Sequence, residues 1–285
     1  SYDEAVYARL VANHLGTEHT ELYVSAKDAL DVIPELPKIY SEPFADSSQI
    51  PTFLVSRLAR QHVKVALSGD AGDELFCGYN RYKFTASTWG TIKRIPQPLR
   101  TIMSSALSSI NTNSMNTVGA LFGKNLLGDK LLKGASILVS ENITQLYQSM
   151  VTDWDENQSV VLGLSPEKRP QLHSLNTAGH NMIEEMMFKD VSSYLVDDIL
   201  VKVDRAAMAN SLETRVPFLD HDIVKFAWQL PIGYKLRDGI TKWPLRKILE
   251  KYVPNELIDR PKMGFGVPVD QWLRGPLREW AEDLL

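Results

Sequence analysis

The chain has 285 residues, of which 44% are hydrophobic and 23% charged, the balance of a soluble globular protein with a core of ordinary size. Its net charge of -4 comes without a dense basic stripe, which excludes nucleic acid as an expected partner, and no apolar run approaches the roughly 20 residues that span a bilayer. A single cysteine, Cys77, excludes an internal disulfide framework and fits a reducing cytoplasm, where we expect the protein.

The first part of the chain predicts alternating helices and strands. Residues 3–15 carry apolar side chains at helical spacing, and residues 20–24 are rich in the β-branched and aromatic residues typical of a strand. Ser25 and Asp28 then predict a capping box that opens a helix toward Ile33.

Next, residues 40–49 predict an ordered loop among several prolines. The helix expected after it has Leu54, Val55 and Leu58 on its apolar face, and residues 63–67 follow as a buried strand. The order helix, strand, helix, helix, strand favours an α/β fold with a parallel sheet. Two strands are few for such a sheet, so we expect it to be incomplete on its N-terminal side.

The rest of the chain predicts helices. We expect residues 1–90 to form a nucleotide-binding α/β part, residues 91–180 a helical layer and residues 181–285 a second helical part. The layer includes a polar connector at 153–170. Further helices are predicted at 181–213, 243–252 and 270–285.

An acidic, glycine-containing turn follows the strand at 63–67. It reads Ser68-Gly69-Asp70-Ala71-Gly72-Asp73-Glu74. Parallel sheets bind ligands where their strands end, and small residues let the backbone approach a ligand. Three carboxylates so close repel one another, and a divalent cation such as Mg²⁺ would remove that repulsion. The alternative is a turn that caps the next helix, with Asp73 and Glu74 stabilised by the helix dipole.

Five ordered segments together resemble the asparagine synthase family of glutamine-dependent asparagine synthetases. They are Glu42–Thr52, Ser68–Tyr82, Asp197–Arg205, Leu212–Asp220 and Arg260–Pro268. The resemblance implies a predominantly helical α/β fold with a partial parallel sheet of the adenine-nucleotide α-hydrolase (ATP-pyrophosphatase) type.

The resemblance also implies an activity. ATP would activate the side-chain carboxylate of aspartate as β-aspartyl-AMP, and ammonia from a glutaminase domain of the same parent chain would convert it to asparagine. Ser68 and Gly69 would contact the nucleotide, and Asp70 would serve the adenylate step. Asp73 would bind Mg²⁺. Lys262, on a glycine-containing loop, would stabilise charge at the reacting phosphate and acyl centre.

The chain also departs from the family pattern. Ala71 and Cys77 stand where the family has glycine, and the Ser-Gly-Gly-x-Asp-Ser pyrophosphatase loop is absent. We therefore expect the chain alone to bind ATP poorly and to make no amide, and its open sheet edge makes a homodimer possible. Cys77 itself is interpreted as a small buried thiol.

Other charged residues are weaker candidates for the site. Glu213 and Arg215 favour a structural ion pair. Asp204 and Arg205 fit a buried polar network beneath the site. Lys242 fits either a phosphate contact or a solvated turn lysine.

Two alternatives to aspartate amidation remain at this stage. One is an amidotransferase of the same family that acts on another carboxylate, in polysaccharide or secondary-metabolite biosynthesis. The other is a helical binding module without activity, which retention of Asp70, Asp73 and Lys262 disfavours.

Overall fold

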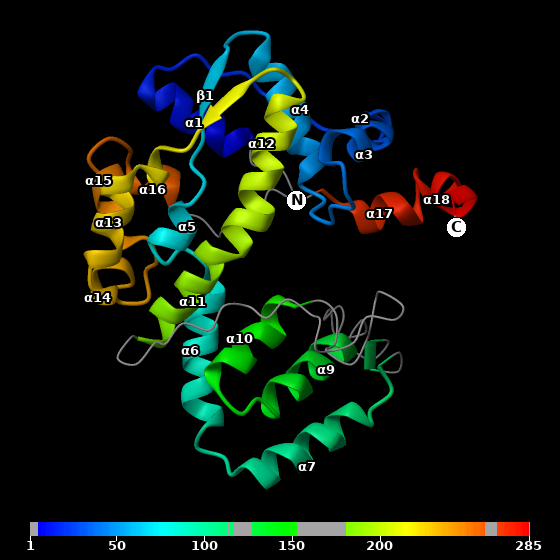
Figure 1. Cartoon of the computed structure of the whole chain (residues 1–285), viewed down its shortest axis with the longest axis vertical. Helices are drawn as coiled ribbons and strands as arrows, with labels where there is room; N and C mark the ends of the chain where they lie inside the picture. Colours follow the sequence, from blue (N-terminus) through cyan, green and yellow to red (C-terminus); the bar gives the residue numbers. More distant parts are fainter. Residues whose placement is uncertain (1–4, 113–114, 117–126, 153–180, 260–266, 285) are drawn as a thin grey trace. The chain divides into compact units, whose positions relative to one another are not determined.

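The computed structural model of the chain describes residues 5–112, 115–116, 127–152, 181–259 and 267–284 (Figure 1). It divides into two compact units, which are described separately. The first comprises residues 1–78 and 190–285, and the second comprises residues 79–189. Among the described residues, helices greatly outnumber strands, and the strands form one small parallel sheet, so the fold is α/β and mostly helical.

The first unit begins with three helices expected from the sequence, α1 (Ala5–Leu15), α2 (Ala26–Val32) and α4 (Gln49–Arg60). A 3₁₀ turn (Ile33–Glu35) and α3 (Leu36–Tyr40) lie between α2 and α4 and were not predicted. Ser25 and Asp28 form the predicted capping box, which confirms that boundary. The strand predicted at 20–24 is wrong, because these residues have no ladder partner in the described structure. Glu21 there instead pairs with Arg9 at 2.6 Å.

Two short strands form the sheet. β1 (Val65–Leu67) pairs in parallel with β2 (Glu213–Arg215), with Val65 opposite Glu213 and Leu67 opposite Arg215. The prediction that the first strand is buried is wrong, since the Leu67 side chain is 75% exposed. Parallel strands are normally covered on both faces, so this exposure marks an uncovered side of the sheet.

The remaining elements of the first unit come from residues 68–78 and 190–285. They are α5 (Gly72–Leu75), a π-helical turn (Tyr194–Leu200), α12 (Val201–Met208), a 3₁₀ turn (Pro217–Leu219), α13 (His221–Gln229), α14 (Ile232–Lys235), α15 (Trp243–Leu249), α16 (Asn255–Ile258), α17 (Val269–Arg274) and α18 (Arg278–Leu284). The helix predicted at 181–213 is therefore interrupted by the π-helical turn, and that predicted at 270–285 is two helices.

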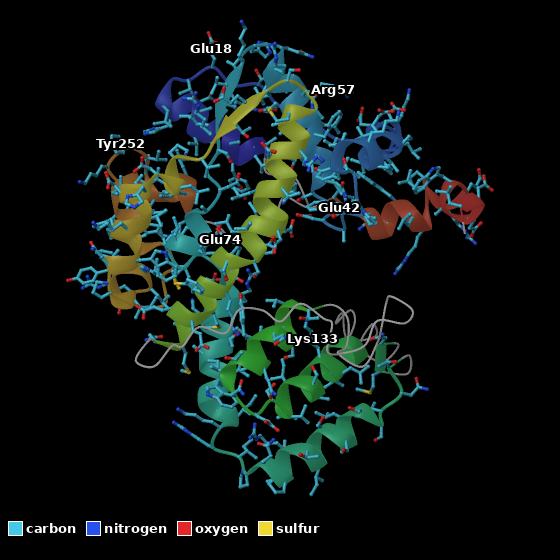
Figure 2. The ribbon with its side chains drawn as sticks, in the orientation of Figure 1. Glu18, Glu42, Arg57, Glu74, Lys133 and Tyr252 are labelled. Carbon is cyan, nitrogen blue, oxygen red and sulfur yellow. The ribbon has the colours of Figure 1, made fainter. Side chains whose placement is uncertain are left out.

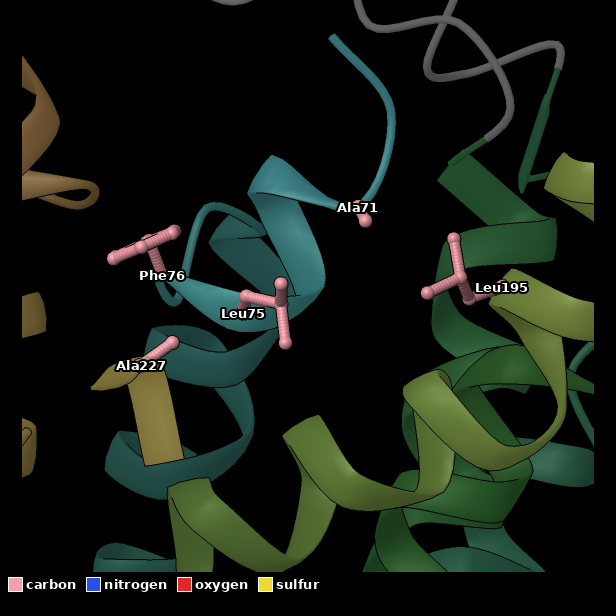
Figure 3. Close-up of a cluster of buried hydrophobic side chains, with 5 residues drawn as sticks. All are labelled: Ala71, Leu75, Phe76, Leu195 and Ala227. Atoms are coloured by element: carbon pink, nitrogen blue, oxygen red, sulfur yellow. The ribbon is translucent and has the colours of Figure 1, made fainter. Parts of the chain in front are cut away.

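A small apolar core supports the turn after β1. Ala71, Leu75 and Phe76 come from the turn and α5, and they cluster with Leu195 and Ala227 (Figure 3). The Phe218 ring packs edge-on against Phe76, with ring centroids 5.8 Å apart. This core anchors α5, and so fixes the acidic turn that joins β1 to α5.

The second unit is helical in its described part. It contains α6 (Asn80–Ile92), α7 (Gln97–Ser108), α9 (Leu127–Leu138), α10 (Ile143–Val151) and most of α11 (Met182–Ser192). Ile92, Ile137 and Leu146 form its apolar core. Arg81 donates to the Tyr147 hydroxyl at 2.9 Å, which ties α6 to α10. The polar connector predicted at 153–170 lies outside the described residues.

Candidate functional site

The acidic turn begins where β1 ends. The Ser68 amide donates to the Arg215 carbonyl at 2.8 Å, one step beyond the strand ladder. The Ser68 hydroxyl donates to the Asp70 carboxylate, and the Asp70 amide lies 3.4 Å from the same hydroxyl. Ser68, Gly69 and Asp70 are therefore held as one small loop, with Gly69 exposed at its tip.

Gly69 has open space around it. A Cβ built on Gly69 meets no atom within 4 Å, so folding of the described residues does not require glycine there. A strand-end glycine that packing does not need is consistent with close approach of a ligand to the backbone.

Asp73 pairs with a lysine far along the chain. The Lys242 ammonium lies 2.9 Å from Asp73 Oδ2, and both side chains are about half-buried. Lys242 precedes α15 and has a φ of 52°, a left-handed conformation that is uncommon outside glycine. Of the two interpretations left open for Lys242, a freely solvated turn lysine is wrong, because its ammonium is directed at the turn.

Gly78 makes this pairing possible. A Cβ on Gly78 would lie 2.0 Å from Asp73 Oδ1 and 2.3 Å from the Lys242 side chain, while the Gly78 amide donates to the Asp73 carbonyl at 2.7 Å. The chain thus folds back against Asp73 so closely that only glycine fits. Gly78 follows the acidic turn closely in the sequence, but its contact with the Asp73–Lys242 ion pair could not be predicted, because Lys242 is far along the chain.

The two departures from the family pattern share one geometry. Ala71 has a φ of 65° and Cys77 a φ of 58°, both in the left-handed region where glycine is favoured. Both residues are buried, as predicted for Cys77. Strained positions concentrate at functional sites, and here they flank Asp73 on both sides.

The three carboxylates of the turn do not converge. Asp70 accepts from Ser68, Asp73 pairs with Lys242, and the Glu74 side chain is buried on α5, where Figure 2 labels it. Among the described residues, no group of three or more acidic, histidine or cysteine side chains is arranged to hold a metal ion. The three carboxylates therefore do not form a ready-made metal site within the described part of the chain.

The residues present still fit one mode of Mg²⁺ binding. Mg²⁺ retains several waters and is commonly held by one or two carboxylates together with substrate phosphates. Asp73 supplies one half-buried carboxylate, and the glycine cradle at Gly78 leaves its Oδ1 uncrowded by any β-carbon. The turn therefore suits a metal that arrives with a phosphate ligand, and does not suit a metal held by protein alone.

A second charged cluster joins two other family-like segments. Lys202, on α12, lies 2.6 Å from Asp46 in the loop before α4, and the Tyr40 hydroxyl donates to the Lys202 carbonyl at 3.3 Å. Burial and, after it, the neighbouring Asp46 carboxylate raise the pKa of Asp198 to about 6. Burial also acts to raise the pKa of Asp46, but hydrogen bonds from Lys202 and Ser48 hold it below its ordinary value.

This cluster was missed from the sequence. The buried network was expected at Asp204 and Arg205, but both side chains are exposed, and Lys202 is the buried charge on that helix. Lys202 and Asp46 are 156 residues apart, so no local pattern indicates the pair. The Glu213–Arg215 ion pair is confirmed at 2.7 Å, and it lies exposed on β2.

The structure holds Ser68, Gly69 and Asp70 in one loop and places Asp73 on α5 in a pair with Lys242. Lys262 lies outside the described residues, so its position is untested. Among the residues that are described, every helix is too short or too polar to cross a bilayer.

The whole chain is similar in sequence to proteins of a known family. The asparagine synthase family model matches residues 1–285. A Mycobacterium bovis protein, whose name assigns it provisionally as a glutamine-hydrolyzing asparagine synthetase, is 36% identical over 98% of this chain and 41% of its own length. Asparagine synthetase [glutamine-hydrolyzing] 1 of Bacillus subtilis is 31% identical over 100% of this chain and 43% of its own length.

A more distant relative, amidase chyE of Penicillium rubens, is 23% identical over 99% of this chain and 44% of its own length. The chain thus spans about two fifths of the length of these curated relatives.

Proposed function

This chain belongs to the asparagine synthase family, and from that premise we propose that it carries the ATP-dependent, amide-forming part of a ligase. The aspartate β-carboxylate attacks the α-phosphorus of ATP, which gives β-aspartyl-AMP and releases pyrophosphate. Ammonia then attacks the acyl carbon, and AMP leaves as asparagine forms. The ammonia derives from glutamine in a separate glutaminase domain of the parent chain.

The observation that carries this proposal is the Asp73–Lys242 pair at the carboxyl end of β1. Adenylation brings an anionic carboxylate to an anionic triphosphate, so the site needs fixed donors and cations. Ser68 and Gly69 offer a polar, sterically open strand end for the nucleotide. The hydrogen bond from Ser68 orients the Asp70 carboxylate, which in this proposal serves the formation of the adenylate.

Lys242 acts, in this proposal, as an exchangeable cation. A half-exposed ion pair is worth little free energy, so Lys242 transfers readily from Asp73 to a phosphate oxygen. Mg²⁺ bound with the triphosphate would neutralise phosphate charge during transfer of the adenylyl group. Asp73, released from Lys242, is the residue that would hold it.

Lys262 supplies the second cation in this proposal. It lies in the Arg260–Pro268 segment, and its compact ammonium would stabilise charge on the reacting phosphate and acyl oxygen. In a chain extended to the length of its relatives, Lys262→Ala should abolish pyrophosphate release with the fold intact. Unchanged release would remove Lys262 from the mechanism.

The uncovered side of β1 bears on activity. Leu67 and Val65 are exposed on a sheet of two strands, fewer than an ATP-pyrophosphatase sheet requires. We propose that further strands and the Ser-Gly-Gly-x-Asp-Ser loop come from sequence that the longer relatives contain. Titration calorimetry of the 285-residue chain should then detect only weak Mg-ATP binding, and micromolar affinity would contradict this.

The same edge gives the proposed homodimer its physical basis. Within the described part of the chain β1 pairs with β2 alone, so its other edge lacks a ladder partner and can pair with a second copy. Sedimentation should show association at high concentration, and a clean monomer would count against it. The buried single cysteine fits a reducing cytoplasm, which is the compartment we propose.

A second candidate function keeps the adenylation and changes the acceptor. Similarity to amidase chyE across almost the whole chain favours it as the alternative, with a polysaccharide or secondary-metabolite carboxylate in place of aspartate. Pyrophosphate release by the extended chain against a panel of carboxylates separates the two. Release with aspartate alone supports the first candidate, and release only with another acid supports the second.

A further inference from the structure

A groove lies in the first unit, away from the acidic turn in sequence. It has a volume of about 460 Å³ and is bordered by the turn Ile33–Glu35, by α3 and by the loop that leads to α4. Its walls are mostly apolar, and Glu42, labelled in Figure 2, stands on that loop after α3. A volume in this range accommodates a small organic molecule.

The groove is built by interactions that exist without a ligand. The Tyr40 ring stacks on Phe44, with centroids 4.6 Å apart and planes within 8°. The Tyr40 hydroxyl donates to the Lys202 carbonyl, and the Gln49 amide nitrogen donates to the Phe44 carbonyl at 2.9 Å. A ligand would therefore enter a groove whose walls are already ordered, which lowers the entropic cost of binding.

One buried acceptor in the groove has no hydrogen bond. The Gln49 residue is only 7% exposed, its side chain lines the groove, and its Oε1 receives no donor from the protein. Because its amide nitrogen is engaged by Phe44, turning the amide over would sacrifice that bond. A buried acceptor left unsatisfied is costly, so a donor from a ligand would be favoured here.

The charges around the groove determine whether a cationic or a neutral donor group is favoured. Glu42 lines it and forms no ion pair within the described part of the chain. Behind the inner wall, Lys202 pairs with Asp46 at 2.6 Å, and Asp198 is a further carboxylate beside Asp46, so these three groups carry a net negative charge. Burial, and then Asp46 and Asp198, raise the pKa of Tyr40. Negative potential beside stacked aromatic rings favours a cation.

We propose that this groove binds a primary ammonium group carried on an aliphatic or aromatic body. The ammonium donates to Gln49 Oε1 and faces the Glu42 carboxylate, while the body packs along the apolar wall. This site is separate from the adenylation turn and requires no ATP, so it stands or falls independently of the amide-forming activity.

The test compares two probes with the same body and opposite charge. The 285-residue chain, labelled with ¹⁵N, is titrated at pH 7 with 2-phenylethylamine and, separately, with 3-phenylpropionate. We expect amide shifts confined to residues 33–49 and an affinity for the amine about tenfold or more above that for the acid. Equal affinity for the two probes, or shifts centred elsewhere, overturns the proposal.

Matched variants assign the binding to the two named acceptors. Glu42→Gln should weaken amine binding about threefold to tenfold, because a rim charge is removed while the fold is kept. Glu35→Gln is the control, since Glu35 pairs with Lys38 on the adjoining turn and does not line the groove; its binding should not change. Gln49→Leu should also weaken the amine.

Gln49→Leu also removes the bond to the Phe44 carbonyl, so its fold is checked by thermal unfolding. If that variant loosens the loop, Glu42→Gln still decides the matter. Unaltered amine affinity in Glu42→Gln overturns the proposal.

Discussion

Two aspartate–lysine pairs lie in the first unit, and their surroundings differ. Lys242 meets Asp73 at 2.9 Å with side-chain exposures of 31% and 24%, beside a strand end. Lys202 meets Asp46 at 2.6 Å with exposures of 10% and 23%, and a second carboxylate, Asp198, lies close by. The two aspartates are about equally exposed, but Lys242 is more exposed than Lys202, so Lys242 exchanges partners at less cost while Lys202 anchors a loop. The same chemistry therefore serves a ligand site in one place and stability in the other.

The sharpest separation is expected from deleting each lysine. Lys202→Met leaves two neighbouring carboxylates without their cation and should lower the free energy of unfolding by about 3 kcal/mol. Lys242→Met removes a half-exposed partner and should cost less than about 1 kcal/mol. Urea unfolding measures both, with exposed Lys251→Met as the control. Equal losses at the two sites would end the distinction.

The glycine against Asp73 gives the next largest effect. Gly78→Ala places a methyl group 2.0 Å from Asp73 Oδ1 and 2.8 Å from the Asp73 Cα, so the turn must shift at a cost of about 2 kcal/mol. Gly90→Ala, inside α6 with nothing within 4 Å, should instead stabilise by about 0.5 kcal/mol. Thermal unfolding distinguishes them, and a stabilised Gly78→Ala would contradict the close approach.

The second carboxylate makes the buried cluster sensitive to pH. The pKa of Asp198 in the folded state is raised to about 6, above its ordinary value of 3.8, so the folded state binds the proton more tightly. Stability from this group is full below about pH 4 and is lost as pH rises through 6. Asp198→Asn should remove about 1 kcal/mol of this pH-dependent change in the free energy of unfolding, after discounting for partial exposure.

Urea unfolding between pH 5 and 8 measures this slope. Asp46 has the opposite sign, because its pKa is lowered, and its contribution disappears only as pH falls below its ordinary range. Asp197→Asn, at the exposed neighbouring position, serves as the control. An identical slope in wild type and Asp198→Asn would refute the assignment.

The smallest expected effect concerns strain beside Asp73. Ala71→Gly relieves a left-handed φ of 65° but gives up a buried methyl group, seen in Figure 3, so stability should change by less than about 1 kcal/mol. Ala206→Gly, buried in helix α12, has no strain to relieve and should cost about 2 kcal/mol. Equal losses measured by thermal unfolding would show that Ala71 is unstrained.

Local patterns predicted the parts of this fold that depend on neighbours in sequence. Helix α1, the Ser25–Asp28 capping box and the turn after β1 follow from periodicity, side-chain capping and small residues. Strand β2 was missed at the end of the helix predicted at 181–213, because its identity depends on pairing with β1 far along the chain. The strand expected at 20–24 has strand-like composition but no partner.

The candidate site divides in the same way. Ser68 and Asp70, which are close in sequence, are joined by a hydrogen bond in the turn after β1, whereas Asp73 turns to Lys242. The pairing of Lys242 with Asp73 was not predicted, since Lys242 was expected either to contact a phosphate or to be a solvated turn lysine, and the ion pair joins distant turns. The Asp46–Lys202 pair had no sequence signal beyond its two family-like segments.

Pyrophosphate release tests the central claim, that Asp73 holds the metal-bound triphosphate at the strand end. In a chain extended to the length of its relatives, with Mg-ATP and aspartate, Asp73→Asn should reduce release by about a hundredfold or more while the circular dichroism spectrum stays unchanged. Glu213→Gln, on the exposed side of β2, should release pyrophosphate as wild type does. Wild-type release by Asp73→Asn would contradict the account.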